Sequence, residues 1–150
     1  MQYIPIGAKD FPVFHRLLSA YYREGEDADT PQEQLDGFIR YLFDLCVSGR
    51  IRGIIVYDPE PAGFVLWNID SRDGVFSNKP GYGTILEIGV KESVRGSAVG
   101  RRLVSYAESQ MGTRRYYVCA YGPAEHFWKK CGYFDSGELA QNGLKLMVKE

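Results

Sequence analysis

A basic turn with several small residues is the part of this sequence best suited to chemistry. It covers residues 95–100, Arg-Gly-Ser-Ala-Val-Gly, and follows the apolar run 85–90, which predicts a strand. Apolar residues then recur every four positions, at Val99, Leu103, Ala107 and Met111. That spacing predicts a helix with one apolar face. The first N–H groups of a helix lack internal partners and its dipole is positive there, so a strand, a turn and a helix start together predict an anion site.

The side chains of this turn suit a diphosphate. Small residues let phosphate oxygens approach the backbone, and they are Gly96, Ser97, Ala98 and Gly100. Cationic side chains nearby come from Arg95, Arg101 and Arg102. The alternative interpretation is an ordinary helix start with a solvated basic face. A nucleotide-binding P-loop is not predicted, because the Gly-Lys-Ser/Thr of the Walker motif is absent from the sequence.

Composition predicts one globular domain, residues 1–150. The 150 residues are 45% hydrophobic and 25% charged, with a net charge of −1. That charge argues against general attraction to nucleic acid, and no apolar run approaches the roughly 20 residues that span a bilayer. The three cysteines, Cys46, Cys119 and Cys131, lack metal-ligand spacing. We therefore expect no metal and no membrane partner, and reduced thiols in the cytoplasm.

The rest of the chain alternates predicted strands and helices. Strands are predicted over 3–6, 51–57, 62–69, 84–90 and 116–121, and helices over 11–22 and 123–130. Two last strands, 134–140 and 144–148, are expected to form a hairpin, because Asn142-Gly143 between them favours a tight turn. The polar, glycine-bearing segment 71–83 predicts a long mobile loop. This order of elements favours an α/β fold with a mixed sheet.

A further helix has a predicted start and stop. In Thr30-Pro31-Gln32-Glu33, Thr30 is expected at the N-cap and Glu33 at the third helical position, which together form a capping box. Gly49 suits the C-terminal stop. The expected apolar stripe consists of Leu35, Phe38, Ile39, Leu42 and Cys46.

The 95–100 turn resembles motif A of the GNAT superfamily of acetyl-CoA-dependent N-acetyltransferases. The signature Arg/Gln-x-x-Gly/Ala-x-Gly/Ala is matched by Arg95, Ala98 and Gly100. The resemblance implies that this loop holds the pyrophosphate of coenzyme A, with acetyl-CoA as co-substrate. The residues implied to bind it here are Arg95, Gly96, Ser97, Ala98, Val99, Gly100 and Arg101.

The order of elements is similar to the GNAT fold over nearly the whole chain. That fold implies a mixed central sheet of about seven strands with about four helices. Its fourth and fifth strands splay apart, and the gap holds the pantetheine arm of coenzyme A. Carried over by position, the backbone groups that pair with the arm belong to Ile88, Gly89 and Val90.

Residues 124–133 resemble motif B, Ala-x-x-x-Tyr-x-x-x-Gly-Phe, in part. Positions that match are Ala124, Gly132 and Tyr133. Trp128 stands where many members have the tyrosine that protonates the departing thiolate, so it is expected either to contact coenzyme A or to pack the helix on the sheet. Tyr121 stands where many members have an asparagine that contacts coenzyme A. Since a thiol of pKa ~8.5 is a fair leaving group, Tyr121, Tyr133 or water could replace the missing acid.

The resemblance implies an N-acetyltransferase that moves an acetyl group to a primary amine of a small molecule or peptide by direct attack. Glu87, the one carboxylate in the apolar fourth strand, is the candidate general base, and desolvation between Leu86 and Ile88 is expected to raise its pKa. Because strands alternate faces, Glu87 could instead point away and pair with an arginine. His126 is expected on a solvated helix face. The alternative function, favoured by Trp128 and Tyr121, is a non-catalytic acyl-CoA-binding sensor or partner module on the same fold.

The acceptor is predicted only in outline. In GNAT folds the connection between the first two helices commonly borders the acceptor pocket, and here residues 21–29 combine two tyrosines with several acidic side chains. Such a loop would attract a cationic amine. The alternative is a solvated, mobile loop whose tyrosines pack on the core. Family members often dimerise, so a homodimer is also expected.

Overall fold

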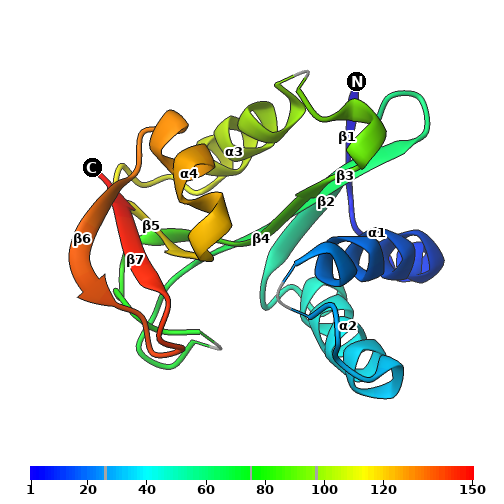
Figure 1. Cartoon of the computed structure of the whole chain (residues 1–150), viewed down its shortest axis with the longest axis horizontal. Coiled ribbons are helices and arrows are strands. Elements are labelled where there is room, and N and C mark those ends of the chain that lie inside the picture. The colour runs from blue at the N-terminus through cyan, green and yellow to red at the C-terminus, as the bar shows by residue number, and fades with distance from the viewer. Residues whose placement is uncertain (26, 75, 97) are drawn as a thin grey trace. The chain divides into compact units, whose positions relative to one another are not determined.

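The computed structural model of the chain describes residues 1–25, 27–74, 76–96 and 98–150. Its elements follow the predicted α/β order (Figure 1). The strands are β1 (Gln2–Pro5), β2 (Arg52–Tyr57), β3 (Pro61–Ile69), β4 (Gly83–Val90), β5 (Tyr116–Ala120), β6 (Phe134–Leu139) and β7 (Lys145–Lys149). The α-helices are α1 (Phe11–Glu24), α2 (Gln32–Val47), α3 (Val99–Gln110) and α4 (Glu125–Lys130). Short 3₁₀ helices cover Ala8–Asp10, Glu92–Val94 and Gly122–Ala124.

The strands form one mixed sheet. Its order is β1-β2-β3-β4-β5-β7-β6 over seven strands. The pairing of β4 with β5 is parallel and joins Gly83 to Tyr116 and Thr84 to Tyr117. Among the described residues this ladder does not continue along 85–90, as expected for strands that splay apart. The predicted mixed sheet of seven strands with four helices is confirmed.

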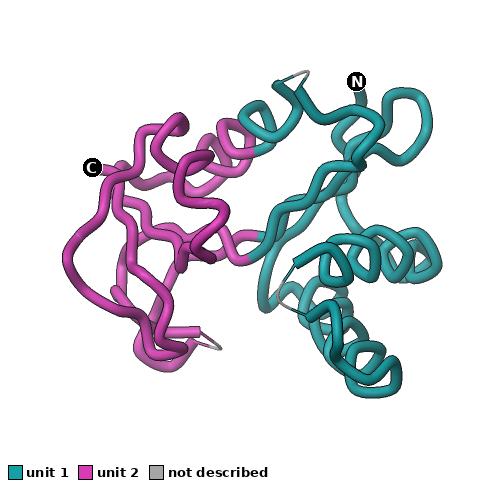
Figure 2. Tube along the Cα trace, in the orientation of Figure 1, with its two compact units in different colours: residues 1–66, 87–103 teal, residues 67–86, 104–150 magenta. Residues whose placement is uncertain are grey.

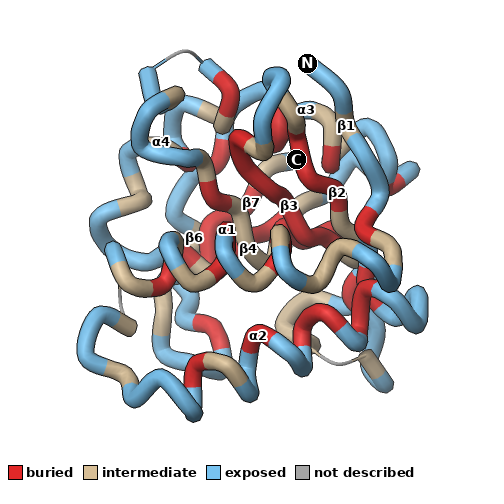
Figure 3. Tube along the Cα trace, turned by 90° about the vertical axis from the view of Figure 1, so that its right-hand side faces the viewer, coloured by how far each residue is buried: buried red, intermediate tan, exposed pale blue. Residues whose placement is uncertain are grey.

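The chain groups into two compact units (Figure 2). One contains residues 1–66 and 87–103, and the other contains 67–86 and 104–150. The one-domain organisation of the chain stays a prediction. Figure 3 shows buried residues along β2 and β3, where apolar side chains occupy successive positions.

The first unit contains α1 and α2, which pack through aromatic side chains. The Phe43 ring of α2 meets the rings of Phe11 and Phe14 edge-on, at 5.1 and 5.3 Å between centroids. On the surface of the helix pair, His15 Nε2 lies 2.7 Å from Asp36 Oδ1. Helix α1 runs two residues further than predicted, to Glu24.

The predicted start of the next helix is wrong in detail. Helix α2 begins at Gln32 after Pro31 and has no side-chain cap. The hydroxyl of Thr30 donates instead to Asp27 Oδ1 at 2.9 Å, so it serves the preceding loop. Of the expected stripe only Phe38 is exposed, whereas the end at Gly49 is confirmed by its left-handed φ of +79°.

The second unit contains the predicted hairpin of β6 and β7. The turn at Asn142-Gly143 is confirmed: Gly143 has φ +86°, and its N–H donates to the Ala140 carbonyl at 2.9 Å. The core beneath it joins the hairpin to β5 through Tyr117, Ala140, Leu146 and Val148.

A buried carboxylate anchors the loop 71–82 in the second unit. Asp70 is 2% exposed, and its Oδ2 accepts from the backbone N–H groups of Asn78 and Lys79, each at 2.7 Å. The hydroxyl of Tyr117 donates to the same oxygen at 2.7 Å. Burial first, and then this bond, raise the pKa of Tyr117. One side chain therefore holds the loop that the sequence predicts to be mobile, at Asn78 and Lys79.

Candidate functional site

At Gly89, near its C-terminal end, β4 passes so close to its neighbours that only glycine fits. A Cβ at Gly89 would lie 2.5 Å from Phe64 Cε1 and 3.1 Å from Tyr21 Cδ1. A Cβ at Gly63 on β3 would lie 2.6 Å from the Gly89 carbonyl oxygen. The backbone N–H of Lys91 donates to the Ala62 carbonyl at 2.8 Å, just past the end of β4. These contacts fix the segment in which Ile88, Gly89 and Val90 are expected to present their backbone groups.

The turn after β4 has an open backbone. Gly96 has φ +86°, and apart from the glycine and its two chain neighbours no described atom lies within 4 Å of where its Cβ would be. Ala98 also has a positive φ, +66°, a conformation that L-residues other than glycine rarely adopt. Ser97 lies outside the described residues. The arrangement leaves room for a ligand close to the peptide groups at the start of α3.

Helix α3 begins at Val99, and the residues around its start behave as the apolar pattern predicts. Val99 is buried, Gly100 is half-buried and Arg101 is exposed. The N–H of Arg102 donates to the Ala98 carbonyl at 3.1 Å, which completes the first turn. The predicted apolar face is confirmed, since Val99, Leu103, Ala107 and Met111 are all buried.

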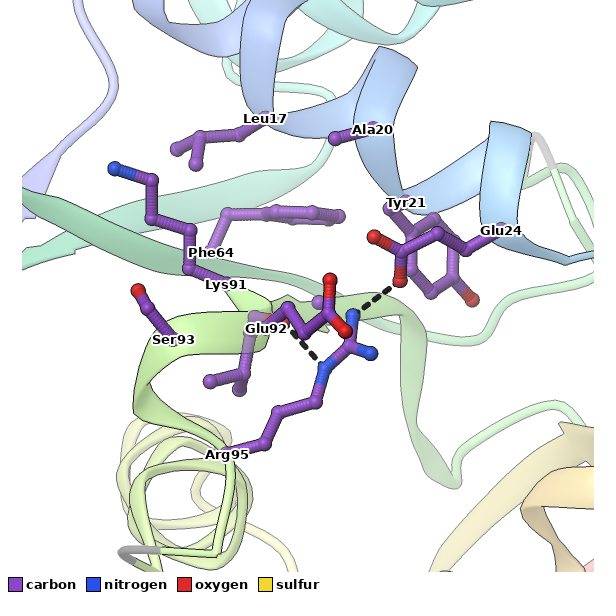
Figure 4. Close-up of a pocket in the computed structure, with 11 residues that line it drawn as sticks. Leu17, Ala20, Tyr21, Glu24, Phe64, Lys91, Glu92, Ser93 and Arg95 are labelled. Carbon is purple, nitrogen blue, oxygen red and sulfur yellow. Dashed lines mark hydrogen bonds and ion pairs between the residues drawn. The ribbon is translucent and has the colours of Figure 1, made fainter.

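Arg95 ties three segments of the first unit together. One of its terminal nitrogens, Nη2, forms an ion pair with Glu24 Oε2 at the end of α1. Its Nε donates to the Val90 carbonyl at 3.0 Å, at the end of β4 (Figure 4). The sequence predicts this side chain beside a diphosphate. In the structure, two of its nitrogens bond to Glu24 and Val90, and these contacts hold Arg95 against the end of α1.

Glu87 is half-buried in β4, and its carboxylate affects the pKa of a buried tyrosine of α1, Tyr22. Burial first, and then the charge and hydrogen bonding of Glu87, raise the pKa of the Tyr22 hydroxyl well above its usual range. Tyr22 is thus a neighbour of the candidate base that sequence reasoning missed. Its place in the apolar periodicity of 11–24 is the only signal for it in the sequence.

A pocket of about 450 Å³ lies between α1 and the segment 91–95 (Figure 4). Leu17, Tyr21 and Glu24 line it from α1, and Phe64 lines it from β3. The rings of Tyr21 and Phe64 meet edge-on at 5.6 Å. The end of β4 reaches the same pocket at residues 89–90, so the pocket adjoins the backbone that the fold predicts for the pantetheine arm.

The acidic loop after α1 is organised by Arg23. Its Nη1 donates to the carbonyls of Asp27 and Thr30 at 3.0 and 2.6 Å. Glu24 pairs with Arg95 and Asp27 accepts from Thr30, so two of the predicted acidic groups have partners inside the unit. Glu26 lies outside the described residues.

Trp128 and Tyr121 belong to the second unit. Trp128 is 6% exposed, and its ring meets that of Tyr133 edge-on at 5.3 Å, which matches the packing alternative for this residue. Tyr121 is 38% exposed, and its carbonyl accepts from the N–H of Ala124 at 2.8 Å. The Tyr133 hydroxyl donates to Glu108 Oε2 at 2.9 Å, and burial followed by the charge of Glu108 raises the pKa of Tyr133.

Two further expectations concern ligands and partners. Within the described part of the chain, no group of three or more His, Cys, Asp or Glu side chains is placed to hold a metal ion. None of the described helices is both long and apolar enough to cross a bilayer. His126 is exposed on α4, as predicted.

A family model described as the acetyltransferase (GNAT) family matches residues 11–133. The chain belongs to the GNAT acetyltransferase family. The predicted membership of the GNAT superfamily is thereby confirmed, and the protein is an acyltransferase by membership. No curated protein matches the chain.

Solved structures agree with the GNAT fold. An acetyltransferase of Thermus thermophilus is 23% identical, with a TM-score of 0.69 over 99% of this chain and 95% of that one. A PaiA N-acetyltransferase of Thermoplasma acidophilum, in complex with coenzyme A, is 15% identical, with a TM-score of 0.74 over 100% of this chain and 99% of that one. At these identities the similarity shows the fold of this GNAT protein but does not identify its acceptor.

Proposed function

We propose that this GNAT protein is an acetyl-CoA-dependent N-acetyltransferase that acts on a primary amine of a small molecule or peptide. The observation that carries the proposal is the strand–turn–helix of β4, the 95–100 turn and α3, with open backbone at Gly96. The Thermoplasma acidophilum neighbour with coenzyme A supports a coenzyme A site in this fold.

The diphosphate is proposed to bind the peptide N–H groups at the start of α3, including those of Val99 and Gly100. These groups have no partner inside the helix, and the helix dipole favours an anion there. Arg95 contributes by holding the turn in place through Glu24 and Val90, and its guanidinium carries further N–H donors beyond these two contacts. Arg101, which is exposed, adds positive charge. Backbone groups of 88–90 are proposed to pair with the pantetheine amides.

Glu87 is proposed to accept the proton that the amine loses. A lysine-like amine of pKa ~10.4 is almost wholly cationic at neutral pH, so attack needs a base. The nitrogen forms a bond to the acetyl carbon, the carbon–sulfur bond breaks, and the electron pair leaves on sulfur. Tyr121, Tyr133 or water then supplies the proton to the thiolate. The Tyr133 hydroxyl already donates its proton in a hydrogen bond to Glu108, so Tyr121 or water is favoured as the proton donor to the thiolate.

A thiol-release assay of acetyl-CoA against a broad amine panel tests the proposal, with calorimetry of acetyl-CoA binding beside it. We expect micromolar-range binding and release of thiol with at least one primary amine. Binding without release for any amine would support the sensor or partner module instead. Release at the same rate with and without amine would indicate hydrolysis and refute N-acetyl transfer. Trp128→Phe should weaken acetyl-CoA binding if this ring contacts the coenzyme.

A further inference from the structure

The pocket between α1 and 91–95 separates opposite charges over an apolar floor. We propose that it selects an acceptor that carries a carboxylate as well as the reacting amine, that is, an amino acid with an apolar or aromatic side chain. The inference rests on the proposed N-acetyltransferase function and names the substrate class of that site.

The floor of the pocket is aromatic and apolar. Phe64 and Tyr21 meet edge-on at 5.6 Å, and Leu17 and Ala20 line the wall from α1. The Gly89 backbone is pressed against both rings, so the floor is fixed by β4. Such a surface gains from covering an apolar side chain of the ligand, because apolar area leaves water. A volume of about 450 Å³ holds a molecule of the size of phenylalanine with room to spare.

One end of the pocket has an excess of negative charge. Glu24 and Glu92 supply two carboxylates there, and Arg95 supplies one guanidinium that is already paired with Glu24. Figure 4 shows these three side chains together on one side of the pocket. An ammonium group placed there meets a net charge of about −1, which favours the cationic form in which an amine arrives.

The other end carries a positive charge. Lys91 and Ser93 lie on the side of Phe64 away from Glu24 (Figure 4). Lys91 makes no ion pair with any residue that the structure describes. A carboxylate of the ligand would find both an ammonium and a hydroxyl donor at this end. A simple monoamine leaves Lys91 without a counter-charge, and a polyamine would be repelled by it, so the two ends together favour a zwitterion.

The test compares L-phenylalanine with phenethylamine, which is the same molecule without its carboxylate. Lys91→Met removes the charge and keeps much of the apolar stem. The matched control is Lys9→Met, since Lys9 is an exposed lysine of the same unit outside the pocket. We expect Lys91→Met to lower kcat/KM for L-phenylalanine about tenfold, equivalent to about 1.4 kcal/mol. Phenethylamine should change less than twofold, and Lys9→Met should change neither.

Two outcomes would overturn the inference. Lys91→Met could slow both substrates equally, or the unaltered protein could prefer phenethylamine. Calorimetry of L-phenylalanine in the presence of coenzyme A separates this inference from the proposed function. Binding that weakens with Lys91→Met, without turnover of any amine, supports the pocket and refutes N-acetyl transfer. Turnover of amines with no influence of Lys91 refutes the pocket and leaves the acetyltransferase in place.

Discussion

Gly89 should be the position in β4 least tolerant of a methyl group. In Gly89→Ala the new Cβ would lie 2.5 and 3.0 Å from two carbons of the Phe64 ring and 3.1 Å from Tyr21. Both neighbours are rings, and Phe64 is 1% exposed, so its ring cannot move into solvent without opening the core. Overpacking of this kind costs about 1–3 kcal/mol.

The expected result is a lower melting temperature. At about 2–4 °C per kcal/mol for a chain of this size, Gly89→Ala should melt roughly 2–12 °C below the unaltered protein. The matched control is Gly37→Ala in α2, where no described atom outside the neighbouring helix backbone lies within 4 Å of the new Cβ. A helical alanine is better than glycine by about 0.5–1 kcal/mol, so the control should melt at a higher temperature. Circular dichroism on heating and urea titration measure both.

A second substitution tests the cause. Phe64→Leu removes the ring edge that the methyl group meets, so Gly89→Ala should cost less in that background, by about 1 kcal/mol. If the two changes are additive, the clash with Phe64 is not the reason for the loss. An unchanged melting temperature for Gly89→Ala alone would refute the reasoning at its first step, because it would mean that the floor of the pocket yields freely.

Three other expectations concern residues of the first unit, and one control residue, Gly112, lies in the second. Gly96→Val should cost about 1–2 kcal/mol of stability through its φ of +86° and should weaken acetyl-CoA binding at least tenfold by calorimetry. Gly112→Val, which has φ +64° and equally open surroundings, should share the stability cost and leave binding unchanged. Glu87→Gln should lower kcat/KM at neutral pH and recover as pH rises towards the pKa of the amine, whereas an unchanged pH–rate profile would remove Glu87 from the reaction. The hydrogen bond from His15, followed by that from Gln32, lowers the pKa of Asp36, so this carboxylate stabilises the fold above its unfolded pKa of ~3.9 and loses that effect as pH falls through its folded value. Asp36→Asn should therefore be less stable than the unaltered protein near pH 6, and the difference should shrink as pH falls through the folded pKa of Asp36, so a difference that stays constant as pH falls would contradict the assignment.

Local patterns in the sequence predicted the elements and the turn that marks the family. The four-residue spacing of Val99, Leu103, Ala107 and Met111 identified a buried face because helix periodicity depends only on neighbours along the chain. The hairpin at Asn142-Gly143 was predictable for the same reason.

Contacts between distant positions were not predictable in this way. Tyr22 and Glu87 lie far apart in the sequence, and nothing in either local pattern indicates that they meet. Thr30 has the spacing of a helix cap, yet its hydroxyl donates to the Asp27 carboxylate instead of capping α2. Arg95 was assigned to the diphosphate by its charge and its place in the motif A signature, while its actual neighbours come from the end of α1 and the end of β4. The choice between possible partners depends on the folded arrangement, which no window of the sequence contains.

The anchor at Asp70 also has a consequence for how the second unit opens. Asn78 donates its N–H to Asp70 and accepts, through its side-chain oxygen, the N–H of Gln141 at 2.9 Å. The N–H of Lys79 bonds to the same carboxylate, and that of Gly81 bonds to the Asp70 carbonyl at 2.8 Å. Two residues, Asp70 and Asn78, thus accept hydrogen bonds from four backbone amides in two separate loops, those of Asn78, Lys79, Gly81 and Gln141. They should exchange with deuterium as a single cooperative group, and Asn78→Ala should speed the exchange at Gln141, 63 positions away, along with that of its own loop.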